Sequence, residues 1–417
     1  MSAERIQAVY RIETPLPVER AAAVLAGEQS SGTFVEVPGE TDDLRRRYGA
    51  RVELINPLEP AAAASLPGCR GGVPGGLFNR AQITVSWPVE NIGVNLPTLL
   101  ATVQGNLYEL SQLSGIKLLS IALPDSLARH FRGPAFGAEG SRALCGVVKG
   151  PMIGTIIKPS IGLSPDQTAE LVRTLVEAGI DFIKDDELLA NPPHSPFKQR
   201  VDAVMQVINE HAHRTGRKVM VAFNLTDEFD AMQRNYDHLL AAGGTCAMLS
   251  VNHVGLSATK AICDRGQLAI HAHRNGFGMM NRHPMLGMEF PAYQTIWRLA
   301  GVDQLHVNGI ANKFWEPDDH VVRSIEACLA PMNGLKRLLP VISSGQTGLQ
   351  APETYRRTQT IEVLYQAGGG IMAHPLGPAA GVAALRQAWQ AAVSGITLDE
   401  HAREHVELRG QLKKFGK

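Results

Sequence analysis

The second part of the chain repeats a short apolar run followed by a helical stretch, and this alternation constrains the fold more than any other feature. The eight strand candidates are MIGTIIKP, DFIKDDE, KVMVAFNL, CAMLSVN, LAIHAHR, QLHVNG, LPVISSG and GGIMAHP. Helical periodicity separates them, as in SPDQTAELVRTLVEAG, SPFKQRVDAVMQVINEHAHRTG and PETYRRTQTIEVLYQAG. Eight such units over about 250 residues predict a closed (β/α)8 barrel, a TIM barrel, rather than an open doubly wound sheet.

The first part of the chain has a different pattern. Alternating stretches such as IQAVYRIE, RVELINP and QITVSWP are mixed with helical segments near PVERAAAVLAGE and NLPTLLATVQGNLYELSQL. This mixture predicts an α+β domain with antiparallel strands. The segment FRGPAFGAEG, rich in Gly and Pro, reads as a linker. We therefore expect an α+β domain over residues 1–135 and a barrel domain over residues 136–417.

Charge and cysteine usage limit the classes of partner. Forty Lys and Arg balance forty Asp and Glu, which argues against nucleic acid or an anionic membrane as the ligand. The five cysteines have no metal-binding spacing, and the N-terminus has no apolar leader. We expect reduced thiols, a cytoplasmic location, and a small molecule or a second copy of the chain as partner.

Polar residues stand at the end of almost every strand candidate. They are Lys158, Lys184 to Glu187, Asn224, Asn252, His273, Arg274, His306, Ser344 and His374. Loops are polar in any protein, which explains one or two of these positions. In a barrel, however, all these ends lie on the face that carries the active site, so the whole set predicts a site there.

The segment KDDE contains the strongest chemical signal. Successive strand residues point to opposite faces, so Lys184 and Asp186 share a face and Asp185 points toward the helix layer. Glu187 lies at the start of the loop and can turn inward. Two carboxylates suit a hard cation such as Mg²⁺, which takes few protein ligands.

Lys184 has two possible roles, because an ammonium group cannot bind a metal. It is either a counter-ion for its acidic neighbours or a neutral amine that reacts with CO₂ to form a carbamate, a further oxygen ligand. Burial lowers a lysine pKa and adjacent carboxylates raise it, so the sequence leaves both roles open.

Further candidates lie at other strand ends. Lys158, before Pro159, is either a general base or a surface lysine. His273 could transfer protons and Arg274 could bind an anion, whereas His271 is better explained as a barrel-interior histidine. The run Gly368 to Gly370 falls in the eighth unit, where barrels often bind phosphate through backbone N–H groups.

Several of these segments, in order, resemble the active-site segments of the ribulose bisphosphate carboxylase/oxygenase (RuBisCO) large chain. They are GTIIKPSIGLS, GIDFIKDDE, HAHR, DQLHVNGIANK, PVISSGQ and AGGGIMAHPLG. GEQSSGTF and VQGN resemble substrate-binding segments of that family's smaller domain. The resemblance implies a ferredoxin-like α+β domain, a barrel, and a homodimer in which one chain's N-terminal domain completes the partner's site.

The resemblance also implies roles for individual residues. Lys184 would be the carbamylated lysine, and Asp186 and Glu187 the other Mg²⁺ ligands. Lys158 would abstract a proton and His273 would transfer protons at the substrate hydroxyls. The remaining implied residues bind substrate or lie in the loop after the sixth strand. Arg274, His306 and Ser344 would bind one end, Thr33, Gly368 and Gly369 the phosphate at the other, and Glu28, Asn106 and Lys313 complete the site.

The departures from the carboxylases fall around both ends of a would-be bisphosphate. The second lysine of their KPK motif is Ser160, and the tryptophan after their N-terminal threonine is Phe34. Their Ser-Gly after the sixth-strand histidine is Val307-Asn308, and the last residue of their SGG is Gln346. The chain is therefore identified as a RuBisCO-like protein of form IV, without ribulose bisphosphate carboxylation.

Within that branch the sequence favours carboxyl-group chemistry. Salvage enolases of the family carry a lysine base at the position of Asn106, whereas Lys313 matches the carboxylase lysine that contacts the carboxyl group. We expect a Mg²⁺-dependent transcarboxylase/hydrolase or decarboxylase of a 3-oxo acid sugar phosphate, such as 3-oxo-isoapionate 4-phosphate. The alternatives are a methionine-salvage enolase or isomerase acting on a methylthio-ketose phosphate, and a non-catalytic regulatory homologue.

Overall fold

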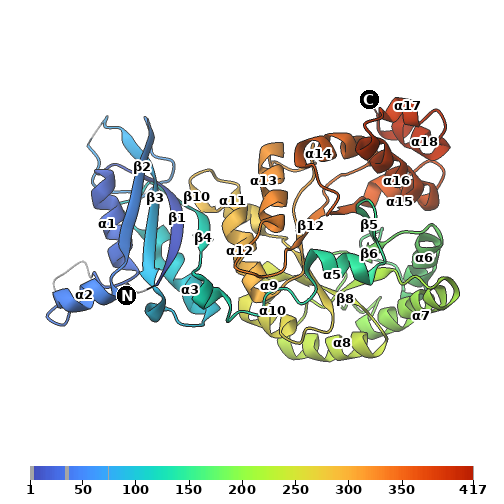
Figure 1. Cartoon of the computed structure of the whole chain (residues 1–417), viewed down its shortest axis with the longest axis horizontal. Helices are drawn as coiled ribbons and strands as arrows, with labels where there is room; N and C mark the ends of the chain where they lie inside the picture. Colours follow the sequence, from blue (N-terminus) through green and yellow to red (C-terminus); the bar gives the residue numbers. More distant parts are fainter. Residues whose placement is uncertain (1–3, 33–36, 74, 417) are drawn as a thin grey trace. The chain divides into compact units, whose positions relative to one another are not determined.

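The computed structural model describes residues 4–32, 37–73 and 75–416, which form two compact units (Figure 1). The first unit is Met1–Arg132 with Gly276–Leu299, and the second is Gly133–Asn275 with Ala300–Lys417. Residues 276–299 fall within the expected barrel domain by sequence position. They cluster instead with the N-terminal unit, because a strand within them joins its sheet.

The first unit contains a five-stranded mixed sheet in the order β10-β4-β1-β3-β2. The strands are β1 (Arg5–Thr14), β2 (Arg51–Ala61), β3 (Phe78–Pro88), β4 (Gly115–Ala122) and β10 (Leu286–Met288). All pairs are antiparallel except β10 with β4. Its helices include α1 (Val18–Glu28), α2 (Asp42–Tyr48) and α3 (Leu96–Val103). The predicted α+β domain is confirmed, although β4, β10 and α2 were not predicted.

A buried lysine joins the inserted segment to this sheet. Lys117 in β4 donates from Nζ to the carbonyl oxygens of Asn281 (2.6 Å) and His283 (2.7 Å), and Glu289 Oε1 lies 3.7 Å away. Burial lowers the pKa of Lys117, and Glu289 opposes this. The segment holding α11 (Phe277–Asn281) and the first part of α12 (Phe290–Ala300) is thus tied to the N-terminal sheet.

The second unit is a closed barrel of eight parallel strands with helices outside (Figure 1). In barrel order the strands are β5 (Met152–Ile156), β6 (Phe182–Lys184), β7 (Met220–Asn224), β8 (Cys246–Ser250), β9 (Ala269–His273), β11 (Gln304–His306), β12 (Leu339–Ile342) and β13 (Leu364–Gln366). The helices that alternate with them include α6 (Pro165–Glu177), α7 (Phe197–Thr215), α8 (Phe229–Ala241), α10 (Leu256–Cys263), α13 (Asp318–Leu329), α14 (Ala351–Thr358) and α16 (Pro378–Ser394). The predicted (β/α)8 barrel is confirmed.

The position predicted for the eighth strand is wrong. The run GGIMAHP lies largely in the short helix α15 (Gly368–Met372), and the strand is β13, inside a stretch predicted as helix. β13 pairs with β12 on one side and β5 on the other, so barrel closure overrides the local helical pattern. His374 consequently does not end a strand, and its Nε2 lies 2.9 Å from the carbonyl oxygen of Glu407.

The predicted linker is also only partly correct, because its second half begins helix α5 (Gly137–Leu144). Ala138 and Cys145 pack in one core with Met152 and Leu339, near the starts of their strands. Asp303, just before β11, accepts hydrogen bonds from the backbone N–H groups of Phe136 (2.6 Å), Gly137 (2.8 Å) and Ile270 (2.8 Å). The first turn of α5 is thus fixed to the barrel.

Two further features of the described residues are the length and polarity of the helices and the state of the cysteines. Within the described ranges, every helix is too short or too polar to cross a membrane. The cysteines are free thiols, and all except Cys69 are buried.

Candidate functional site

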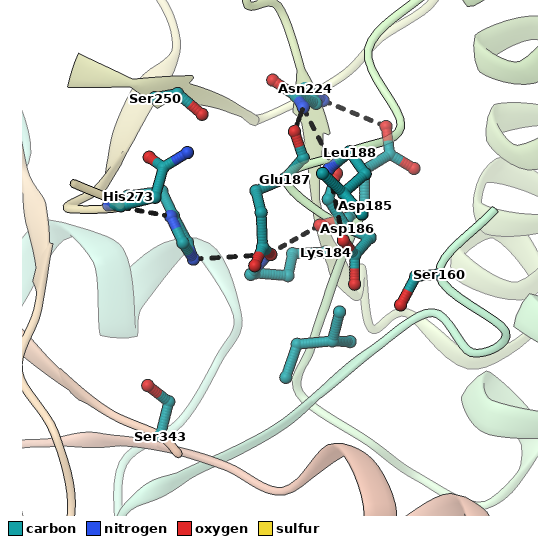
Figure 2. A network of polar contacts seen from close by, with 12 residues as sticks. Ser160, Lys184, Asp185, Asp186, Glu187, Leu188, Asn224, Ser250, His273 and Ser343 are labelled. Atoms are coloured by element: carbon teal, nitrogen blue, oxygen red, sulfur yellow. Dashed lines mark hydrogen bonds and ion pairs between the residues drawn. The ribbon is translucent and has the colours of Figure 1, made fainter. Parts of the chain in front are cut away.

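The barrel brings Lys158, Lys184, Asp186 and Glu187 together at the carboxyl ends of β5 and β6. Lys158 Nζ lies 2.6 Å from Asp186 Oδ2 and 2.7 Å from Ser160 Oγ. Lys184 Nζ lies 3.7 Å from Glu187 Oε2. Figure 2 shows Glu187 between Lys184 and His273, with Asp186 and Ser160 on the other side. The two carboxylates predicted as metal ligands therefore lie beside both predicted lysines.

Lys184 is fully enclosed, with 1% of its surface exposed. Its Nζ donates to the carbonyl oxygen of Asp185 at 2.7 Å. Burial lowers the pKa of Lys184, although the charges of Glu187, Asp186 and Asp185 oppose the shift. Burial therefore outweighs the neighbouring charges in its effect on this pKa, and it increases the population of the neutral amine, the form that can attack CO₂.

Asp186 keeps its negative charge for a local reason. Burial alone would raise its pKa, but the hydrogen bonds from Lys158 and from the backbone N–H of Leu188 lower it below the usual range. An ionised carboxylate can bind a metal ion directly, and a neighbouring amine that burial makes less basic can form a carbamate. The two groups together therefore suit a metal site.

Asp185 faces the helix layer, as the strand alternation predicts. Its Oδ2 accepts hydrogen bonds from Arg200 Nη2 (3.1 Å) in α7 and from the backbone N–H of Asn224 (3.0 Å) in β7. Arg200 is completely buried and also donates to the carbonyl oxygens of Ser195, Leu189 and Ala190. This buried pair fixes the turn that carries Asp186 and Glu187.

Three histidines form a connected group. His273 Nε2 lies 3.5 Å from Glu187 Oε2, and its ring lies 4.5 Å from that of His306 between centroids. His306 Nε2 shares a hydrogen bond of 2.8 Å with His271 Nε2, and its Nδ1 lies 3.1 Å from Ser343 Oγ. Burial, reinforced by the charge of Lys184, lowers the pKa of His273 to about 4. His273 is therefore neutral near pH 7 and able to accept a proton.

Arg274, which follows β9, and Ser344, which follows β12, both contact the loop after β11 that carries Lys313. Arg274 Nη2 lies 2.6 Å from Glu316 Oε2, and Ser344 Oγ donates to Asn308 Oδ1 at 2.7 Å. The backbone N–H of Lys313 donates to the carbonyl oxygen of Ser344 at 3.1 Å. The loop that carries Lys313 is thus attached to Ser344, a residue with a φ of 76°, in the left-handed region that non-glycine residues rarely adopt.

Gly368 and Gly369 form the start of α15, next to the lysine end of the site. A Cβ placed on Gly368 would lie 3.7 Å from Lys158 Cε, whereas one placed on Gly369 would have no heavy atom within 4 Å. The backbone at Gly369 is therefore open to a ligand.

Two of the predicted site residues in the N-terminal unit, Glu28 and Asn106, contact each other. Asn106 Nδ2 donates to Glu28 Oε1 at 3.4 Å, so these two side chains lie together. Thr33 and Phe34 fall outside the described residues.

The donor set fits a carbamate-assisted Mg²⁺ site. Among the residues that the structure describes, no three His, Cys, Asp or Glu side chains are arranged to hold a metal ion. Asp186 and Glu187 provide two carboxylates, and the enclosed amine of Lys184 is the group beside them that CO₂ could convert into a third. Oxygen ligands of this kind are those that Mg²⁺ prefers.

Comparison with known proteins identifies the family to which this chain belongs. The chain matches the models of the ribulose bisphosphate carboxylase large chain, N-terminal domain over residues 2–127 and catalytic domain over residues 138–415. The chain therefore belongs to the RuBisCO large-chain family, as its sequence motifs predicted.

Individual relatives are similar over nearly their whole length. The 3-oxo-isoapionate-4-phosphate transcarboxylase/hydrolase of Xanthobacter autotrophicus is 50% identical, covering 98% of this chain and 99% of the relative. The 3-oxo-isoapionate-4-phosphate decarboxylase of Rhizobium etli is 48% identical, with 98% of both chains covered. The crystal structure of a RuBisCO-like protein from Burkholderia fungorum superposes with a TM-score of 0.93 at 47% identity, covering 99% of this chain and 100% of the other.

Sequence reasoning missed two charged residues near the site. Arg200 lies on the buried face of α7 with Phe197, Val201 and Val204, but that apolar pattern does not reveal which acidic residue it contacts. Glu316 is one of many acidic loop residues, and only the fold reveals its contact with Arg274. Arg200 contacts Asp185, and Glu316 contacts Arg274. Since a buried charge needs a partner of opposite sign, looking for the counter-ions of Asp185 and Arg274 would have found both residues.

Proposed function

We propose that this protein is a Mg²⁺-dependent enzyme that removes or moves the carboxyl group of a branched 3-oxo acid sugar phosphate, 3-oxo-isoapionate 4-phosphate or a close analogue. The observation that carries the proposal is the full-length identity of 48–50% to two relatives named for this substrate. The intact group of Lys158, Lys184, Asp186 and Glu187 supports it.

The metal would be held by Asp186, Glu187 and the carbamate of Lys184. When bound, Mg²⁺ would polarise the substrate ketone and stabilise the negative charge that develops on its oxygen. The Arg200–Asp185 pair would hold the ligand-bearing turn in place, because a buried, multiply hydrogen-bonded residue restricts the backbone beside it.

The remaining residues would handle the carboxylate and the protons. Lys313 would attract the substrate carboxylate through its ammonium group. Cleavage of the bond to the carboxyl carbon sends its electron pair toward the ketone, and the carbon left behind then needs a proton. Lys158 Nζ, which contacts Asp186 and Ser160, would supply or remove that proton. Neutral His273 would accept a proton from a substrate hydroxyl.

The phosphate would bind at the open backbone of Gly368 and Gly369 with Thr33, and Arg274, His306 and Ser344 would line the opposite end of the site. We further propose a cytoplasmic homodimer in which Glu28, Thr33 and Asn106 of one protomer complete the barrel site of the other. A mixture of two site-defective variants, Lys184→Met and Asn106→Ala, would then recover activity by forming mixed dimers with one intact site.

Product identification tests the proposed function. The protein is incubated with 3-oxo-isoapionate 4-phosphate or, in a separate reaction, with a methylthio-ketose phosphate, each with Mg²⁺ and bicarbonate in deuterated buffer. Release of CO₂ identifies a decarboxylase, and formation of 3-phosphoglycerate identifies a transcarboxylase/hydrolase. Deuterium incorporation into a methylthio-ketose phosphate without C–C cleavage, and no conversion of the oxo acid, would instead identify the salvage enolase or isomerase.

A further inference from the structure

At the end of the site lined by Arg274, the carboxylate of Glu316 contacts this arginine. Glu316 Oε2 accepts a hydrogen bond from Arg274 Nη2 at 2.6 Å and another from Asn308 Nδ2. The two charged side chains are only 9% and 3% exposed. In such a buried place an opposite charge in contact cancels most of the attraction that an arginine offers to an anion.

Glu316 is held firmly in this position. Asn308 Nδ2 bonds its carboxylate, and Asn312 Nδ2 donates to its backbone carbonyl oxygen at 3.0 Å. Asn312 also donates to the carbonyl oxygen of Gly309 at 3.0 Å, which closes the loop on itself. The carboxylate is therefore part of the ordered loop base rather than a side chain that is free to move away.

The other groups predicted for this end are also engaged with the protein. Ser344 Oγ donates to Asn308 Oδ1 at 2.7 Å, and both ring nitrogens of His306 have partners, His271 and Ser343. Arg274, Asn308, Glu316 and Ser344 thus form one network, here called the Glu316 network. Its formal charges, one positive and one negative, sum to zero.

The Glu316 network also offers an unused acceptor. Glu316 Oε1 is buried and receives no hydrogen bond from the described residues. A phosphate near pH 7 has little capacity to donate, whereas a hydroxyl can donate to this oxygen. Net neutrality and a spare acceptor both favour an uncharged hydroxyl-bearing group over a phosphate.

We propose that Glu316, positioned by Asn308, is a specificity-determining residue that makes this end of the site accept a hydroxyl-bearing group and reject a second phosphate. The proposal rests on the proposed function, since it assigns the substrate's single phosphate to the Gly368–Gly369 end. It also accounts for Asn308, one of the departures from the carboxylase pattern: the amide connects Ser344 to Glu316.

The test compares ribulose 1,5-bisphosphate with ribulose 5-phosphate, which differ by one phosphate. Calorimetric binding to the whole protein with Mg²⁺ and bicarbonate is measured for the wild type, Glu316→Gln and the control Glu326→Gln, an exposed position in α13. The wild type and control should bind the bisphosphate no more tightly than the monophosphate. Glu316→Gln should bind the bisphosphate about tenfold more tightly or better, with the monophosphate changed less than about threefold, because close charge pairs couple at least this strongly.

Two results would overturn the proposal. One is wild-type protein that already prefers the bisphosphate by about tenfold, a comparison that needs no variant to fold. The other is a folded Glu316→Gln protein whose preference is unchanged. Failure of the proposed function is a separate result, because it appears as no turnover of the oxo acid phosphate by the wild type whatever the binding preference.

Discussion

The buried pair of Arg200 and Asp185 allows a quantitative prediction about the support of the metal site. Replacing Arg200 with Met removes the guanidinium but leaves the Asp185 carboxylate, which is 2% exposed. The carboxylate keeps the hydrogen bond from the backbone N–H of Asn224. Removing one partner of a buried ion pair costs about 3–5 kcal/mol. We expect the barrel to lose stability by this amount, and the turn with Asp186 and Glu187 to loosen.

A double-mutant cycle separates the charge from the packing. Asp185→Asn together with Arg200→Met removes both charges, so the double variant should recover about 1–3 kcal/mol relative to Arg200→Met alone. Lys260→Met breaks the Lys260–Asp264 pair, which is shorter at 2.6 Å than the Arg200–Asp185 pair at 3.1 Å but has side chains 31% and 47% exposed. This change should cost less than about 1 kcal/mol.

Amide hydrogen exchange of peptides from β6 and β7 gives the free energy of opening in this part of the barrel, without requiring that both units unfold together. The reasoning is refuted if Arg200→Met costs no more than Lys260→Met, or if the double variant is no more stable than Arg200→Met.

Further predictions concern pH and a glycine in β10. Burial raises the pKa of Asp303 to about 6, despite opposing backbone hydrogen bonds. Its contribution is therefore complete below the unfolded pKa near 4 and is lost as pH rises through about 6, so barrel stability should fall by about 3 kcal/mol over that range. Asp303→Asn should lack this slope in urea titrations at several pH values, and an equal slope in the variant would contradict the assignment. Gly287 and Gly68 both have a φ of 86°, but a Cβ on Gly287 would lie 1.7 Å from the carbonyl oxygen of Met280, whereas one on Gly68 meets nothing within 4 Å. Gly287→Ala should therefore destabilise the N-terminal unit by more than about 2 kcal/mol and Gly68→Ala by about 1 kcal/mol; equal costs, measured by exchange of β4 peptides, would count against a steric origin.

The sequence predicted the barrel because strand and helix periods alternate along it. It also predicted that the candidate site residues lie together, because the strand ends of a barrel converge. Asp185 was assigned to the helix layer from alternation alone, and its contact with Arg200 confirms this. The predicted position of the eighth strand was wrong because β13 has only three residues, too few to show a strand pattern beside a helical stretch. Residues 276–299 joined the other unit through the pairing of β10 with β4 and through Lys117, long-range contacts that no local pattern encodes.

The sequence alone could not predict the surroundings of the buried charged residues. The sign of the pKa shift of Lys184 depends on burial, which only the fold determines. Glu316 follows the predicted Lys313 by three residues, yet its contact with Arg274 spans 42 positions and depends on how the loop folds back. Counter-ions of buried charges are therefore the part of a site least accessible from the sequence.

The direct test of the central claim is whether Lys184 carries a carbamate when Mg²⁺ is present. The protein is equilibrated with ¹³C-bicarbonate and Mg²⁺ and examined by ¹³C NMR, with Lys184→Met and Lys198→Met, a change at an exposed lysine of α7, as comparisons. We predict a carbamate resonance in the wild type and in Lys198→Met, with loss of both the resonance and the turnover of the oxo acid phosphate in Lys184→Met. Full turnover by Lys184→Met, or a wild-type enzyme active without any carbamate signal, would contradict the account.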